Sequence, residues 1–177
     1  SALRAARIPY NRIAGEGFFK RREVLDVIAM LKWVLDPWDE EAMLGVLRSP
    51  FVGLSDEDLM SLARTEKGLA ASFHDDTSDP LLKHPERLAQ GRLLFRDLYR
   101  RREWPPARWL DRLLSLTCYE SVLMDHRMGL QRVSNLRKLR KMAENFSQTD
   151  LDVLTAFVEY LEEQSVREMK EGEAELQ

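Results

Sequence analysis

The chain has 177 residues, of which 44% are hydrophobic and 32% are charged. This composition excludes intrinsic disorder, which needs fewer apolar residues, and a membrane protein, which needs fewer charges. The single cysteine excludes an internal disulfide and is typical of a reducing compartment. No apolar stretch is long enough to cross a bilayer and no signal peptide is visible, so we expect a cytoplasmic chain of about one domain.

The net charge of −3 conceals separate basic and acidic segments. Residues 83–112 hold nine Lys and Arg against four acids, and residues 127–141 hold six against none. Residues 142–177 hold two against ten. A folded chain of this kind can present a basic face although its pI is about 5.7, and only that face would meet an anionic partner.

The first predicted element is a strand over residues 7–14, bounded by Gly15 and Gly17. It is the only good strand candidate, and a single strand is not stable by itself. We therefore expect its partners to lie elsewhere, either in another part of a longer chain, of which this one would be a fragment, or in a partner molecule.

Helical periodicity dominates the rest of the chain. Asp39 is predicted to cap a second helix, and Ser55 with Asp58 forms a capping box for a third, which Gly68 closes. The predicted helices cover 22–35, 40–48, 56–67, 85–103, 106–117, 131–145 and 149–170, with a short turn at 119–124 and a loop at 74–80. The fold class is therefore mainly α, an irregular multi-helix bundle with one N-terminal strand and an acidic frayed tail at 171–177.

Residues that carry catalytic chemistry are scarce. There is no phosphate-cradling glycine loop, and the three histidines and the cysteine lack zinc spacing. Glu168-Met169-Lys170 resembles a nuclease triplet, but it lies in a predicted charged helix rather than on a strand. Cys118 is expected to be buried and inert beside Tyr119. We expect no catalytic residue and no metal site in this chain.

Two basic clusters are candidates for contacts with phosphates. Arg92, Arg96 and Arg100 recur every four residues, so they are expected to share one helix face, extended by Arg101 and Arg102, with Leu93, Leu94 and Leu98 opposite. The second cluster lies at 131–145. Its members are Arg132, Arg137, Lys138, Arg140 and Lys141. The alternative is that both clusters are solvated faces of amphipathic helices, and the sequence leaves the two interpretations open.

A predicted turn at Gly53 leads into the helix that begins after Ser55. Free backbone amides at such a helix start can hold a phosphate, so Gly53 and Ser55 are candidates as well. Asp56, Glu57 and Asp58 argue against strong binding, because they already complement the helix dipole and repel an anion.

Two separated stretches carry the motifs of one family. The residues of the first stretch are Ile8, Pro9, Tyr10, Gly15, Gly17, Phe18, Phe19, Glu23, Val24, Asp26, Asp36, Pro37, Asp39, Leu47, Arg48, Ser49, Pro50, Gly53, Leu54, Ser55 and Asp56. The second stretch is a helix with the pattern G-x-x-R-x-x-N-L, formed by Gly129, Arg132, Asn135 and Leu136. Together they resemble the UvrD/Rep-type superfamily 1 DNA helicases, in the form found in the AddA/RecB helicase–nuclease branch.

The resemblance implies that residues 18–177 are the inserted helical subdomain called 2B and that residues 1–17 are an edge segment of the second motor domain, 2A. The intact enzyme would be a bacterial ATP-driven 3′-to-5′ DNA helicase/exonuclease that needs ATP and Mg²⁺, with nucleoid-associated activity in double-strand-break repair and recombination. This segment would need no cofactor. Its implied partners are duplex DNA, the remaining motor domains and a second nuclease/helicase subunit, with no membrane.

Two other functions compete with a DNA-facing subdomain. In the first, the helices form an interaction module that docks a partner subunit or the motor domains, and Tyr10, Phe18 and Phe19 would be exposed for that purpose. In the second, the chain is a helix–turn–helix regulator. The helix after Ser55 would then enter a DNA groove, which its acidic first turn disfavours.

Overall fold

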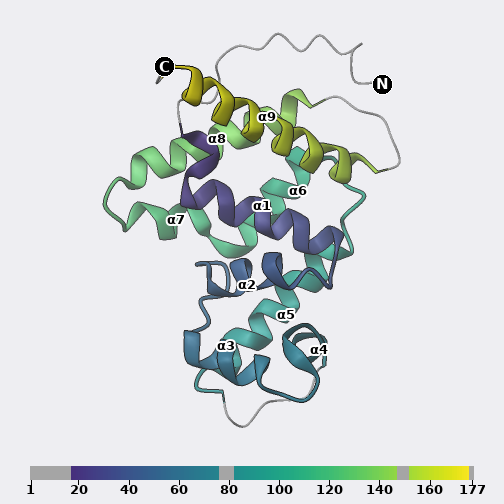
Figure 1. The fold of residues 1–177 in the computed structure, drawn as a ribbon. Helices are drawn as coiled ribbons and strands as arrows, with labels where there is room; N and C mark the ends of the chain where they lie inside the picture. Colours follow the sequence, from purple (N-terminus) through teal and green to yellow (C-terminus); the bar gives the residue numbers. More distant parts are fainter. Residues whose placement is uncertain (1–16, 76–81, 147–151, 176–177) are drawn as a thin grey trace.

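The computed structural model describes residues 17–75, 82–146 and 152–175, with side chains described as far as residue 171. These residues form one short 3₁₀ helix and nine α-helices and contain no strand, which confirms the mainly α fold class for the described part of the chain (Figure 1). The predicted strand at 7–14 lies outside the described residues. The helices are η2 (Phe18–Lys20), α1 (Arg22–Leu35), α2 (Glu40–Arg48), α3 (Asp56–Ala63), α4 (Gly68–His74), α5 (Pro85–Tyr99), α6 (Pro106–Thr117), α7 (Tyr119–Met124), α8 (Gly129–Asn145) and α9 (Val153–Glu175).

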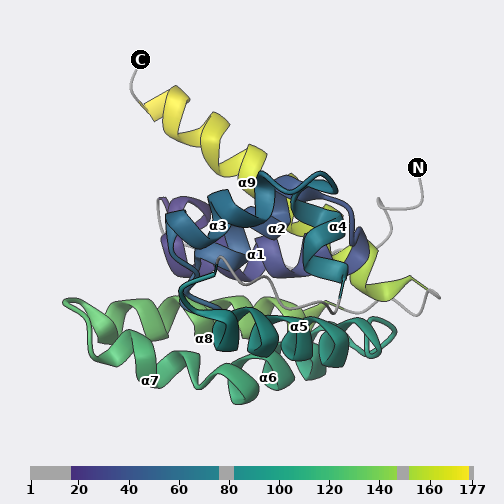
Figure 2. The same ribbon diagram turned by 90° about the horizontal axis from the view of Figure 1, so that it is seen from below.

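Helix α1 is the centre of the fold and packs against α2, α5, α8 and α9. Figure 2 shows two layers, with α5 to α8 in one and α1 in the other together with the remaining helices. The last turns of α9 extend away from both layers (Figure 2). The fold therefore places the two predicted basic clusters, on α5 and α8, in the same layer.

Local signals set the helices whose bounds agree with the prediction. The side chain of Asp39 accepts a 3.0 Å hydrogen bond from the amide of Ala42 and so caps α2. Ser55 caps α3 in the same way, accepting from the amide of Asp58 at 3.1 Å. Pro106 begins α6, where its missing N–H costs nothing.

The predicted helix over 56–67 is instead two helices, α3 and α4. Gly68 does not close a helix but begins α4, and its φ of +77° reverses the chain between them. The predicted helix over 85–103 ends at Tyr99, because the following residues form tight turns with Arg101 N donating to Leu98 O and Trp104 N to Arg101 O.

Phe18 and Phe19 are buried in the core, with 2% and 5% of their surfaces exposed. The expectation that these aromatic residues await a partner was wrong, because they pack inside this chain at the start of α1; Tyr10 lies outside the described residues. The last helix also differs, since α9 continues to Glu175 where the sequence predicted a frayed tail from residue 171.

Candidate nucleic-acid interface

The basic residues of α5 do not share one exposed face. Arg92 is only 8% exposed, and its guanidinium donates hydrogen bonds to the carbonyls of Phe73 at 2.6 Å and Ser72 at 2.7 Å. Leu93, predicted on the apolar face, is 64% exposed. Leu94 and Leu98 are buried as predicted, so the predicted faces were wrong at Arg92 and Leu93. Arg92 joins α5 to α4 and is not accessible to a phosphate, whereas Arg96 and Arg100 lie on the surface.

Asp97 organises the arginines where α5 meets α6. Arg112 donates to the two carboxylate oxygens of Asp97 through Nε and Nη2, both at 2.9 Å. Arg101 Nη1 forms a second ion pair with Asp97 at 2.7 Å. The Arg112 hydrogen bonds hold the pKa of Asp97 below its ordinary value, so the carboxylate stays ionised and both arginines are held in place.

Aromatic rings hold further guanidinium groups beyond Asp97. The guanidinium carbon of Arg108 lies 3.9 Å from the centroid of the Trp104 ring, and that of Arg101 lies 5.1 Å from the same ring. Arg102 lies over Tyr99 at 4.4 Å. We name Arg100, Arg101, Arg102 and Arg108, with Tyr99 and Trp104, the arginine corner.

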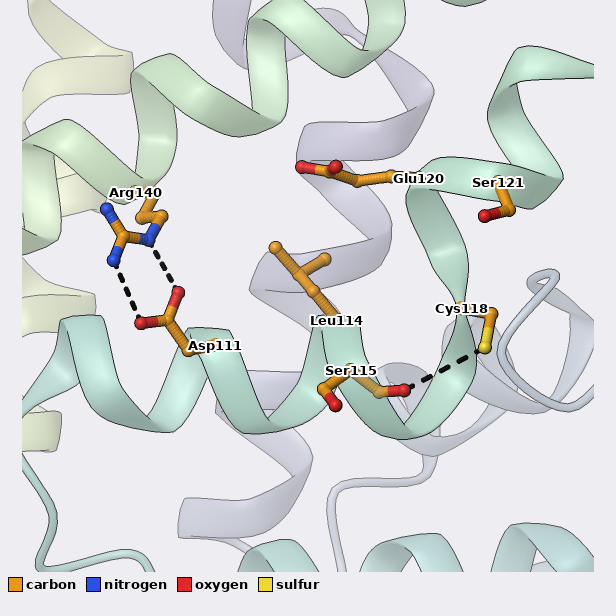
Figure 3. Close-up of a pocket in the computed structure, with 7 residues that line it drawn as sticks. All are labelled: Asp111, Leu114, Ser115, Cys118, Glu120, Ser121 and Arg140. Carbon is orange, nitrogen blue, oxygen red and sulfur yellow. Dashed lines mark hydrogen bonds and ion pairs between the residues drawn. The ribbon is translucent and has the colours of Figure 1, made fainter.

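The basic cluster on α8 is partly neutralised by carboxylates. Arg140 forms a two-pronged ion pair with Asp111 of α6 and also pairs with Glu144 (Figure 3). Lys141 pairs with Glu144 at 3.2 Å. Arg137 is exposed and Lys138 is half-buried. Arg132 is half-buried.

The predicted phosphate site at Gly53 and Ser55 is occupied by the protein itself. The carbonyl of Gly53 accepts a hydrogen bond from Arg87, and the Ser55 hydroxyl donates to Asp58 at 2.8 Å while capping α3. Arg48 pairs with Asp56 in the first turn of α3 at 2.8 Å. The Ser55 hydroxyl is therefore already engaged within the chain, and the first turn of α3 is acidic.

The residues that carry the family resemblance meet in the interior instead. Asn135 of α8 donates a 2.7 Å hydrogen bond to the carboxylate of Glu23 in α1, and both side chains are 3% exposed. Asp26, one turn along α1, accepts from the Tyr119 hydroxyl at 2.7 Å and pairs with Arg22 at 3.1 Å. These motif positions are therefore structural, because they join α1 to α7 and α8.

Burial sets the protonation states in this network. It raises the pKa of Asp26 above the ordinary value of 3.8, although the Tyr119 hydroxyl and Arg22 oppose that shift. Burial and the neighbouring Asp26 hold the pKa of Tyr119 well above its ordinary value, so the phenol keeps its proton and remains the donor. The sequence did not predict that Tyr119 is part of this network, since nothing in its local pattern separates it from other core aromatic residues.

Backbone geometry explains why two of the motif positions are glycine. Gly17 precedes η2 with a φ of +74°. Gly129 is buried at the start of α8, where an added Cβ would lie 2.7 Å from the carbonyl oxygen of Leu123. Only glycine allows α7 and α8 to approach this closely. Of the other two motif glycines, Gly53 has a φ of +70° and Gly15 lies outside the described residues.

No three His, Cys, Asp or Glu side chains in the described part of the chain are grouped to hold a metal ion. Glu168 of the nuclease-like triplet accepts a 3.3 Å hydrogen bond from the backbone of Phe19. Cys118 is exposed, so the prediction that it is buried was wrong. The backbone turns there with a φ of +48°. The thiol points to the carbonyl of Ser115, beside a hollow between α6, α7 and α8 (Figure 3).

The described residues thus form a helical domain with a basic corner and a buried polar network. None of the described helices has the length and apolar character that a membrane crossing requires. The chain belongs to the UvrD-like helicase C-terminal domain family, whose pattern matches residues 1–177.

Curated relatives agree with this assignment, and each of them bears the name of an ATP-dependent helicase/nuclease subunit. The chain is 26% identical over 171 residues to the protein of Listeria monocytogenes serotype 4b (strain F2365), covering 94% of this chain and 14% of that protein. It is 31% identical over 161 residues to the protein of the same name from Acetivibrio thermocellus, covering 88% of this chain and 13% of that protein. The corresponding Anoxybacillus flavithermus protein is 26% identical, with 97% and 15% covered. The chain therefore spans about a seventh of the length of these relatives.

Sequence reasoning did not identify Trp104, Arg108 and Asp97 as parts of the basic surface where α5 meets α6. A signal was present, because residues 100–109 interleave arginines with Trp104 and Trp109, a pattern that favours stacked guanidinium groups. Pro106 begins α6, and the proline pair at 105 and 106 also turns the chain so that Arg108 returns to Trp104.

Proposed function

We propose that this chain is a non-catalytic, duplex-facing 2B-type subdomain of an ATP-dependent 3′-to-5′ DNA helicase/exonuclease that acts in double-strand-break repair and recombination. ATP and Mg²⁺ would be used by motor domains outside the described residues, and a second nuclease/helicase subunit would be the partner. Family membership and the relatives named as ATP-dependent helicase/nuclease subunits support the enzyme class.

The observation that carries the DNA-facing role is the basic surface at the α5–α6 junction. Arg96, Arg100, Arg102 and Arg108 are exposed there, and the nearby Asp97 is balanced by Arg101 and Arg112. Such a surface would contact phosphates, because its arginines lie along the sides of helices. It would not read bases, because it offers no helix end that could enter a groove. The acidic start of α3 likewise argues against a helix–turn–helix regulator.

The test is the salt dependence of duplex binding, measured by fluorescence anisotropy. If about three phosphates are engaged, log affinity falls with log salt with a slope near −2.7, following the rule of about 0.9 per phosphate. Binding that does not respond to salt would contradict the proposal.

A second candidate is an interaction module that docks a partner subunit or the motor domains without DNA. Burial of Phe18 and Phe19 removes the support expected from them, but the tip of the α7–α8 hairpin favours this function. Met128 and Leu130 there are 69% and 77% exposed. Charge reversal at Arg96 and Arg100 in the intact enzyme separates the candidates, since a docking module predicts unchanged duplex unwinding and a DNA-facing one predicts a loss.

A further inference from the structure

The arginine corner differs from the other basic surfaces of the described chain in how its cations are held. The guanidinium carbon of Arg108 lies 3.9 Å from the centroid of the Trp104 ring. The guanidinium carbon of Arg102 lies 4.4 Å from the centroid of the Tyr99 ring. Arg102 Nη1 also donates to the Tyr99 carbonyl at 3.1 Å. On α8, by contrast, Arg140 and Lys141 are held by carboxylates, which cancel their charge.

Holding a guanidinium on an aromatic ring preserves its charge. The ring fixes the side chain through cation–π attraction while the N–H groups at the edge remain available as donors. Asp97 is compensated by Arg101 and Arg112, so the arginines of the corner that it does not neutralise are Arg100, Arg102 and Arg108. The turn that connects α5 to α6 holds one acid, Glu103. The corner thus combines unneutralised positive charge with side chains whose ordering cost is already met in the unbound protein.

The same contacts decide which form of nucleic acid fits. Proteins that bind single strands offer aromatic faces on which unpaired bases stack. Here Trp104 is covered by Arg108, while Tyr99 stacks on Phe95 at 5.6 Å and carries Arg102. A guanidinium group therefore already lies against each ring. What the corner offers is a set of guanidinium donors, which match backbone phosphates.

We infer that the arginine corner is a preorganised contact for the phosphate backbone of duplex DNA and that Arg102 and Arg108 each engage a phosphate. This inference rests on the proposed DNA-facing function and names the surface that would perform it. Arg100 adds to the local potential, and Asp97 acts only by positioning Arg101 and Arg112.

The test compares three double variants of the whole chain for binding to a short fluorescent duplex between about 50 and 200 mM salt. The first, Arg102→Gln with Arg108→Gln, removes two charges. The second, Arg102→Lys with Arg108→Lys, keeps the charges and removes the planar groups. The control, Arg64→Gln with Arg127→Gln, removes two exposed arginines outside the corner. Circular dichroism confirms that each variant is folded.

The glutamine pair is expected to reduce the magnitude of the salt slope by about 1.8, the value for two phosphates, while the control keeps the native slope. The lysine pair is expected to keep the slope and to bind several-fold more weakly, because lysine lacks the stacked planar fork.

Three results would overturn the inference, and they are distinguishable. If the native chain binds duplex with a salt-dependent affinity and the glutamine pair binds identically, the corner is excluded while the proposed function stands. If a single strand binds more tightly than the duplex and quenches tryptophan fluorescence, the choice of duplex is wrong. If the native chain shows no salt-dependent duplex affinity, the proposed function fails together with the inference.

Discussion

Asn135 and Glu23 are separated by 112 residues in the chain, yet they share a 2.7 Å hydrogen bond in the interior. A buried carboxylate needs such donors, because water is not available to solvate it. The residues that carry the family resemblance at these two positions are therefore explained by packing of α8 on α1. They are not residues that touch a ligand.

Replacement of Asn135 by alanine is expected to lower the free energy of unfolding by about 2 to 4 kcal/mol, since Glu23 would remain buried without its donor. Urea denaturation followed by circular dichroism measures the change. Ser134→Ala, at a half-buried position of the same turn, is the control and should stay within about 0.5 kcal/mol of the native protein. A similarly small effect at Asn135 would contradict the structural role.

Asp26 predicts a specific pH dependence. Its pKa is raised in the folded chain, so the native state binds the proton more tightly than the unfolded state. The contribution of this group to stability is therefore greatest below its ordinary pKa of 3.8 and falls as pH rises through the folded value. Asp26→Asn removes this titration and should gain stability relative to the native protein from about pH 4 to pH 7. Urea midpoints at a series of pH values measure it, and a difference independent of pH would count against the assignment.

At the scale of elements, the α7–α8 hairpin depends on a close approach of backbones. Met128 adopts a φ of +68°, and the next residue, Gly129, lies so near α7 that a Cβ would be 2.7 Å from the Cα of Met124. Side chains cannot relieve such a contact, because the opposing atoms belong to the backbone. The hairpin in turn places Asn135 against α1, where it donates to Glu23.

Gly129→Ala is therefore expected to destabilise the fold by about 1 to 3 kcal/mol, the usual cost of overpacking. Gly45→Ala is a matched control on α2, where the new Cβ would meet only the Cβ of Ala29 at 3.4 Å. That substitution should be neutral or stabilising by up to about 1 kcal/mol, because alanine favours the helix. Thermal unfolding of both variants distinguishes them, and equal effects would contradict the argument.

At the scale of the molecule, one hydrophobic core joins the described helices. It runs without interruption from Phe18 beside α1 to Leu161 in α9. Trp33 on α1 and Trp109 on α6 are both fully buried in it, although they belong to different layers. The layers therefore share their stability.

Denaturation is accordingly expected to show one cooperative transition, with the tryptophan fluorescence and far-ultraviolet circular dichroism curves coinciding. Two separated midpoints would indicate that α3 and α4, or α9, unfold independently of the rest. The glutamine and lysine double variants of Arg102 and Arg108 should keep this single transition, since both arginines lie on the surface.

The sequence by itself determined the fold class, the bounds of α1, α2 and α6, and the caps at Asp39 and Ser55. These features depend on residues within one or two turns of each other, so local patterns suffice. Tertiary structure alone decided that Arg92 is buried, that Phe18 and Phe19 are covered and that Cys118 is exposed. The physical reason is that burial and charge pairing depend on which distant helix covers a given face, and a four-residue spacing of arginines does not contain that information.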